Sequence, residues 1–233
     1  METLSPKDRK EAGHFVVEGL RAVTGVLDAP GVGDIEIFCT SEWIERFPNA
    51  NLVSDEVAKK IAGTVTPQGI FAVVPISEEP SLLSVNPRVA LFFEMQDPGN
   101  AGTVLRSAHA FGIDAVVFAK GSVDPYSAKV VRASAGSISS VSILFGVDGF
   151  EVIERLKSSH QIVAFDVAGS DISQMSFTRP TLMIFGNEAR GLPREVTDDQ
   201  SIKRVRIPMA ENIESLNVAS AATIAMYEIS RRD

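Results

Sequence analysis

The sequence contains little of what several common protein classes require. Cys39 is the only cysteine among its 233 residues, which leaves no partner for an internal disulfide and too few thiolates for a metal site. The histidines at 14, 109 and 160 stand far apart and form no HExxH pair, so we expect no metal. No apolar run approaches the roughly 18 residues of a membrane span, and the charged start METLSPKDRK has no hydrophobic stretch behind it. We therefore expect no membrane anchor, no secretion signal and a cytoplasmic location.

Positive charge is also scarce. The chain has 22 basic and 30 acidic residues, a net charge of -8, which does not attract a polyanion at long range. Residues 1–86 carry most of the imbalance, with 7 basic and 13 acidic residues. A nucleic-acid-binding function would therefore need a local basic patch. The candidates for such a patch are Lys129, Arg132, Lys203, Arg204, Arg206, Arg231 and Arg232.

The apolar content, 45%, is ordinary for a globular protein with a buried core, and the length suits one large domain or two small ones. In the first segment, Val16, Leu20, Val23 and Leu27 recur at helical spacing, and strand-like runs follow at 35–39 and 69–75. This pattern predicts a small α/β domain over residues 1–76.

A composition change separates this domain from the rest. Residues 77–87, SEEPSLLSVNP, hold two prolines and three serines, which is typical of a linker. From Arg88 onward, short unalternating apolar runs alternate with helical segments. Strands buried on both faces have this appearance, so we predict a parallel α/β sheet over residues 88–233.

Two polar segments follow predicted strands of this sheet. In EMQDPGNAGTVLRSAHAFG, Asn100 is placed to cap a helix, and Arg106 points away from the buried face that contains Val104. In MIFGNEARGLP, Gly186 lets the backbone approach a ligand, and Glu188 lies beside it. A solvated arginine and an ordinary glycine turn are the simpler interpretations. A phosphate loop of the Walker type is excluded, because Leu-Pro stands where Lys-Ser or Lys-Thr is required.

A third polar segment, RIPMAENIESLNVASA, leads from the last predicted strand into an alanine-rich helix. Ser215 and Asn217 lie at the start of that helix, where exposed N–H groups are suited to holding polar ligand atoms. Amphipathic packing explains the helix but does not explain the polar residues at its start.

Together, DPGNAGTVLRSAHAFG, IFGNEARGLP and IPMAENIESLNVASA resemble the motifs of the SpoU family of RNA ribose methyltransferases, TrmH-like members of the SPOUT class. The resemblance implies S-adenosylmethionine as methyl donor, a homodimer and a C-terminal trefoil knot. It also implies that residues 1–76 form a ribosomal-protein-like domain that recognises the RNA substrate. Carried over by position, the cofactor contacts are Gly186, Asn187, Ile207, Met209 and Leu216. The polar active-site positions are Asn100, Arg106, Glu188, Ser215 and Asn217.

The implied reaction is 2′-O-methylation of a ribose in structured RNA, with ribosomal RNA as the first candidate substrate and transfer RNA as the next. Because an arginine guanidinium stays protonated in proteins, our hypothesis is that Arg106 grips a phosphate beside the target ribose. A non-catalytic RNA-binding or assembly factor on the same scaffold is the main alternative. Methylation of a base or another acceptor is a third.

Overall fold

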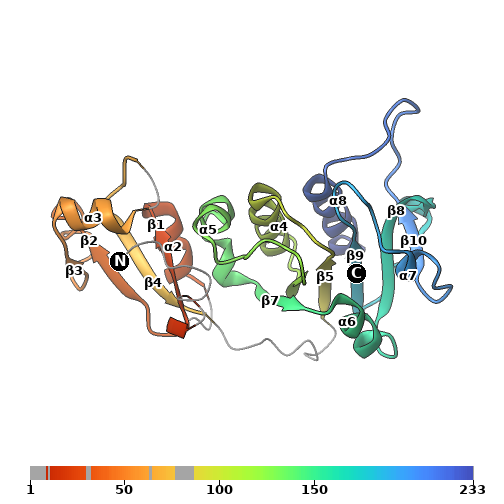
Figure 1. The fold of residues 1–233 in the computed structure, drawn as a ribbon, viewed down its shortest axis with the longest axis horizontal. Coiled ribbons are helices and arrows are strands. Elements are labelled where there is room, and N and C mark those ends of the chain that lie inside the picture. The colour runs from red at the N-terminus through yellow and green to blue at the C-terminus, as the bar shows by residue number, and fades with distance from the viewer. Residues whose placement is uncertain (1–8, 10, 30–32, 63–64, 77–86, 233) are drawn as a thin grey trace. The chain divides into compact units, whose positions relative to one another are not determined.

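The computed structural model describes residue 9 and residues 11–29, 33–62, 65–76 and 87–232 (Figure 1). The predicted linker therefore lies outside the described residues except for Pro87. The chain forms two compact units. Unit 1 comprises residues 1–78 and 124–140, and unit 2 comprises residues 79–123 and 141–233.

Unit 1 contains a mixed sheet with the strand order β1-β4-β2-β3. The strands are β1 (His14–Glu18), β2 (Glu36–Cys39), β3 (Asn51–Leu52) and β4 (Ile70–Pro75), and the helices are α2 (Leu20–Leu27) and α3 (Asp55–Ile61). The helix expected from Val16 onward begins only at Leu20. Phe15 and Val17 alternate inward on β1, which pairs antiparallel with β4, and Gly19 at φ 92 breaks the chain before the helix.

Residues 124–140 pack in unit 1, although the sequence places them between two strands of the second predicted domain. They form α5 (Ala128–Ser134) and the 3-10 helix η1 (Ser137–Ser140). Tyr126 packs against Phe15 with ring centroids 5.1 Å apart, and Arg9 pairs with Asp124. Burial, with Asp124 nearby, raises the pKa of Tyr126 to about 12, so this ring stays uncharged in the core.

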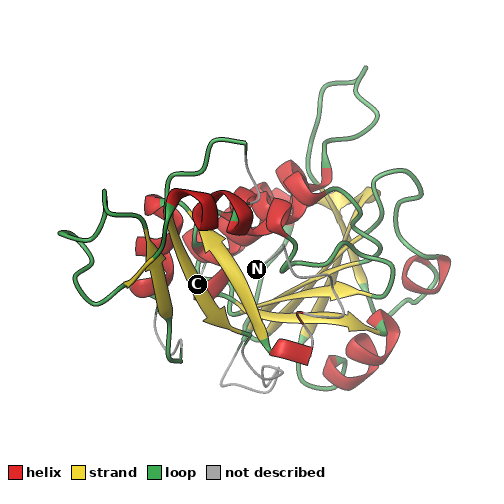
Figure 2. Cartoon of the chain, turned by 60° about the vertical axis from the view of Figure 1, so that its left-hand side comes forward, coloured by secondary structure: helices red, strands yellow, loops and turns green. Residues whose placement is uncertain are grey.

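Unit 2 contains the predicted parallel sheet, with the strand order β10-β8-β9-β5-β6-β7. Every pairing in it is parallel. Its strands are β5 (Arg88–Phe92), β6 (Ala115–Ala119), β7 (Ser142–Val147), β8 (Gln161–Asp171), β9 (Thr181–Phe185) and β10 (Lys203–Arg206). Its helices are α4 (Pro98–Ala110), α6 (Gly149–Leu156), α7 (Arg194–Thr197) and α8 (Val218–Ser230), with a 3-10 turn η2 (Ile172–Gln174). The helices are drawn in red in Figure 2.

The helices cover the sheet in two layers. The apolar sides of α6 and α7 pack on one face, in a core that includes Leu91, Leu156 and Val196. Helices α4 and α8 lie side by side (Figure 1), joined by a hydrogen bond of 2.6 Å between the hydroxyls of Ser107 and Thr223. Among the described residues, no helix is long and apolar enough to cross a membrane.

A row of phenylalanine rings crosses the carboxyl ends of four adjacent strands. Phe118 on β6, Phe92 on β5, Phe185 on β9 and Phe165 on β8 stack with centroid separations of 5.9, 4.9 and 4.9 Å. The strand order also reverses here, because β6 and β7 extend the sheet on one side of β5 while β9, β8 and β10 extend it on the other. Ligands of open α/β sheets bind at such reversals, beyond the carboxyl ends of the strands.

Candidate cofactor and active site

The segments that follow β5 and β9 meet at this strand reversal. Phe92 lies opposite Phe185 in the parallel ladder, so the two chains leave the sheet side by side. The side-chain amide of Asn187 donates to the backbone oxygen of Glu94 at 2.8 Å, and Arg190 pairs with the carboxylate of Glu94. Two of the three polar segments are therefore tied together by both backbone and side-chain contacts.

The loop after β9 closes on itself. Asn187 and Gly191 exchange two backbone hydrogen bonds of 2.9 Å, and the side-chain oxygen of Asn187 accepts from two further amides of the loop. A Cβ atom on Gly186 would lie 2.2 Å from the carbonyl carbon of Gly191. The sequence predicts that the bare Gly186 admits a ligand, whereas the space of its missing side chain is filled by the loop's own backbone.

Asn100 does not cap α4, contrary to the prediction. The helix begins one residue after Asp97, whose carboxylate accepts from the amide of Asn100 at 2.8 Å, and Pro98 occupies the first helical position. This shift leaves the side chain of Asn100 free for contacts with the other two polar segments.

Three side chains, one from each polar segment, form a directed chain of hydrogen bonds. Asn100 donates to Oε1 of Glu188 at 3.0 Å, and Asn217 donates to Oδ1 of Asn100 at 3.0 Å. The oxygen of Asn217 accepts from the amides of Ala219 and Ser220 and so caps α8. The positive end of α8 is thus linked through two amides to a carboxylate at the strand reversal.

Beside this network lies a cleft of about 600 Å³ at the carboxyl ends of β8, β9 and β10. It is lined by all the predicted cofactor residues, namely Gly186, Asn187, Ile207, Met209 and Leu216. Glu188, Ser215 and Asn217 of the predicted active-site set also line it. Asn100 joins the rim through its two hydrogen bonds.

Arg106 stands apart from the cleft. It lies exposed on α4 and is not among the residues that line the cavity. Within the described part of the chain, no carboxylate forms an ion pair with it. Its side chain is therefore available to a phosphate, but only to one that approaches the outer side of α4.

The cleft suits a nucleoside that carries a charged amino-acid tail. Its volume lies in the range of cofactor sites, and the rings of Phe165 and Phe185 give it an aromatic floor. Carboxylates of Asp166 and Glu214 line it as well. These groups fit S-adenosylmethionine, which combines flat adenine, a sulfonium, an ammonium and a carboxylate. Among the described residues, no three His, Cys, Asp or Glu side chains gather as metal ligands.

Sequence reasoning missed Phe165 and Asp166. Asp166 follows the apolar run of β8, and its carboxylate pairs with Arg204 at 3.3 Å and accepts from the amide of Ala168 at 3.1 Å. The signal was present, because an acid that follows the buried residues of a parallel strand marks the point where the strand leaves the core, near the edge where ligands bind.

Residues 87–227 match the SpoU rRNA methylase family. The chain belongs to this family. The resemblance inferred from the three motifs is therefore confirmed. Residues 4–72 match a second family, the MRM3-like substrate binding domain.

Relatives of this SpoU family member match it over nearly its whole length. An uncharacterized tRNA/rRNA methyltransferase of Synechocystis sp. is 34% identical over 97% of this chain and 87% of its own. The 23S rRNA (guanosine(2553)-2′-O)-methyltransferase RlmP of Bacillus subtilis is 29% identical, over 96% and 91%. The SpoU methyltransferase AviRb of Streptomyces viridochromogenes, solved in complex with AdoMet, has a TM-score of 0.82 and 26% identity, over 98% and 94%.

Proposed function

We propose that this protein transfers a methyl group from S-adenosylmethionine to the 2′-hydroxyl of a ribose in structured RNA, with ribosomal RNA as its substrate class. The observation that carries the proposal is the Asn217–Asn100–Glu188 chain at the edge of the cleft. A pure binding protein has no need of such an ordered polar network beside a cofactor-sized cavity. The name of RlmP, which specifies 2′-O-methylation of ribosomal RNA, supports the same reaction.

The cofactor would lie against the backbone of Gly186, Ile207 and Leu216, with Asn187 and Met209 nearby. When bound, S-adenosylmethionine would supply an electrophilic methyl group on a positively charged sulfur. Backbone N–H and C=O groups are suited to reading an adenine edge, and the stacked floor of Phe165 and Phe185 is suited to its flat ring.

The residues at the rim would orient the ribose for in-line attack. In that step a bond forms between the 2′-oxygen and the methyl carbon, the carbon–sulfur bond breaks, and the hydroxyl proton is lost to water at the exposed rim. Asn217 and Ser215 would hold the ribose side, while Glu188, already bonded by Asn100, braces the loop after β9. Orientation of this kind supplies a large part of the acceleration in group transfer.

Arg106 is proposed as a positioning residue that grips an RNA phosphate. Arg106→Lys keeps the charge but loses the planar fork that binds two phosphate oxygens at once. We expect methyl transfer by this variant to fall about tenfold or more with S-adenosylmethionine affinity unchanged. Near-normal turnover by the lysine variant would contradict the bidentate grip.

Several finer features follow from the same proposal. Residues 1–76 would recognise the RNA, and residues 88–233 would carry out the transfer. Two copies would associate as a homodimer, because Ile224 and Tyr227 on α8 remain 36% and 46% exposed. The segment from β9 to α8 would be threaded as a trefoil knot. The proposed place of action is the cytoplasm.

The proposal is tested in two steps. Calorimetry should give saturable binding of S-adenosylmethionine to the whole chain. Mass-spectrometric mapping of ribosomal RNA from a strain that lacks the gene should then find one ribose without its 2′-O-methyl group, and the wild-type gene should restore it. Binding without any missing mark would favour an assembly factor, and a missing mark in transfer RNA would change the substrate class.

A further inference from the structure

A large bulge interrupts the pairing of β8 with β10. Arg204 lies opposite Ala164, but the next residue, Val205, lies opposite Ser170, so residues 165–169 have no partner on β10. Gly169 clamps this bulge to the neighbouring strand, because a Cβ atom there would lie 2.5 Å from the backbone nitrogen of Val205. The bulge is therefore a fixed part of the fold.

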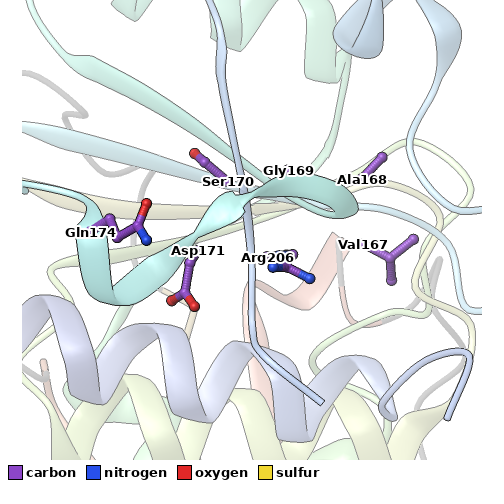
Figure 3. Close-up of a pocket in the computed structure, with 7 residues that line it drawn as sticks. All are labelled: Val167, Ala168, Gly169, Ser170, Asp171, Gln174 and Arg206. Atoms are coloured by element: carbon purple, nitrogen blue, oxygen red, sulfur yellow. The ribbon is translucent and has the colours of Figure 1, made fainter. Parts of the chain in front are cut away.

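The bulge borders two cavities. Its residues Asp166 and Val167 line the cofactor cleft. Val167 to Asp171, with Gln174 and Arg206, line a second, polar pocket of about 450 Å³ (Figure 3). Arg206 lines both cavities. In Figure 3, the side chains of Arg206, Asp171 and Val167 lie on one side of the β8 ribbon, and those of Ser170 and Ala168 on the other.

The charged groups around this pocket differ in whether they are already paired. Arg204 pairs with Asp166, and the hydroxyl of Ser170 donates to the backbone oxygen of Arg204 at 3.3 Å. In the described part of the chain, the guanidinium of Arg206 and the side-chain amide of Gln174 have no hydrogen bond or ion pair. The pocket therefore presents two unused donor groups.

Asp171 faces these donors without pairing with them. Its carboxylate accepts from the amide of Ser173 at 2.8 Å and caps η2. Hydrogen bonds from Ser173 are the main cause that lowers the pKa of Asp171, and the charge of Arg206 adds to them. The carboxylate thus stays ionised and competes with any anion for Arg206. An anion that binds here must be strongly charged and accept several hydrogen bonds.

Most other cations of the predicted basic patch are engaged. Arg232 donates to the backbone oxygens of Ile172, Ser173 and Met175 and pairs with Glu228, while Arg231 lies over the ring of Tyr227. These arginines hold the C-terminal helix in place. Among the arginines of that patch that the structure describes, Arg206 therefore combines an unpaired guanidinium with a position in the lining of the cofactor cleft.

We propose that the polar pocket is a subsite for a backbone phosphate of the substrate RNA, held by Arg206 and Gln174 next to the cofactor cleft. This inference rests on the proposed function, because it takes the RNA as substrate and the neighbouring cleft as the cofactor site. Because Val167 and Arg206 line both cavities, a phosphate bound in the polar pocket would hold the RNA at a set distance from the methyl donor in the cofactor cleft. A guanidinium fork matches two phosphate oxygens, and an amide donor adds a third contact.

The test compares Arg206→Gln with Arg155→Gln in the full chain. Arg155 is an exposed arginine near the end of α6, by the amino end of β8, and it lines neither cavity. The probe is an unmodified 23S rRNA transcript, bound at several salt concentrations. Arg206→Gln should weaken RNA binding about tenfold and lower the salt slope by about 1, while Arg155→Gln should change affinity less than about twofold. Calorimetry should find S-adenosylmethionine affinity unchanged in both variants.

A second variant changes the charge in the opposite direction. Asp171→Asn keeps an oxygen that caps η2 but removes the competing charge, so RNA affinity should rise about threefold. A weakened S-adenosylmethionine affinity with normal RNA binding in Arg206→Gln would assign this arginine to the cofactor instead. Equal losses of RNA affinity in Arg206→Gln and Arg155→Gln would show that only the net charge of the protein matters. Tight binding of inorganic phosphate alone would indicate a site for a free anion. Each of these results overturns the proposal. If wild-type protein binds RNA but transfers no methyl group, the proposed function fails while the phosphate subsite remains measurable.

Discussion

Asn217 connects the stability of α8 to the polar network, so its replacement separates the two roles. Its oxygen accepts from the amides of Ala219 and Ser220 at 2.9 and 3.2 Å, and its nitrogen donates to Asn100 at 3.0 Å. Asn217→Ala removes all three hydrogen bonds. Asn217→Ser keeps a hydroxyl cap but is too short to reach Asn100 with a donor of the same geometry.

The expected losses follow from these contacts. Removal of a side-chain cap costs about 1 kcal/mol, and an exposed hydrogen bond contributes about 1 kcal/mol. Asn217→Ala should therefore lower the unfolding free energy by about 2 kcal/mol, and Asn217→Ser by about 1 kcal/mol. In a chain of this size the larger loss corresponds to a fall in Tm of roughly 4–8 °C. Both variants should lose about tenfold or more in methyl transfer, because both release Asn100.

Thermal unfolding followed by circular dichroism gives the stability change, and transfer of labelled methyl groups to ribosomal RNA gives the activity. The informative comparison is Asn217→Ser, which should recover about half of the lost stability but little of the activity. If serine restored both quantities in parallel, the bond to Asn100 would have no role beyond the cap. If alanine left Tm unchanged, the cap itself would be refuted.

Three further predictions concern other parts of the fold. Gly186→Ala places a Cβ atom against the backbone of Gly191 and should abolish S-adenosylmethionine binding in calorimetry. Gly191→Ala meets open space at φ 69 and should lower the unfolding free energy by only about 1 kcal/mol. Equal effects of the two variants on cofactor binding would refute the loop closure. Burial lowers the pKa of His160 in the folded protein, so the unfolded chain binds more protons near that pH. Stability should therefore fall as the pH drops below about 6.5, the ordinary pKa of histidine. Urea unfolding midpoints at pH 7.5 and 5.5 measure this change. His160→Leu should flatten this dependence, and an unchanged slope would exclude His160 as its source. Arg232→Ala should cost about 2 kcal/mol in urea unfolding and Arg231→Ala under about 0.5 kcal/mol, and a reversed order would contradict the contacts of the C-terminal helix.

The centre of the sheet of unit 2 could be predicted because β5, β6 and β9 are buried on both faces. Runs such as VALFF and TLMIF carry no charged residue and do not alternate with polar ones, so their sequence distinguishes them from surface strands. The three polar segments could be assigned to one site because each follows a strand of the parallel sheet, at the edge where ligands bind.

The local errors have physical causes that were visible in part. Asp97 and Asn100 are both good caps, and Pro98 at the first helical position should have favoured Asp97. Val16 lies on the short strand β1, and its spacing to Leu20 matched that of a helix by chance. The positive φ of Gly19 marks the boundary between this strand and the helix.

Other features depend on contacts between distant residues and could not be predicted. The bulge at 165–169 depends on the register between β8 and β10, which the sequence of either strand alone does not specify. The packing of residues 124–140 in unit 1 depends on partners such as Phe15 and Arg9, more than a hundred residues away.

The central claim is that a cleft built from three loops directs a methyl group to a ribose oxygen. The most direct measurement is incubation of ribosomal RNA from a strain that lacks the gene with the protein and deuterium-labelled S-adenosylmethionine, followed by mass spectrometry of the nucleosides. The account predicts a single nucleoside that carries the labelled methyl group on its 2′-oxygen, with the label lost in Asn100→Ala. Label on a base, or no label in RNA that the protein binds, would contradict it.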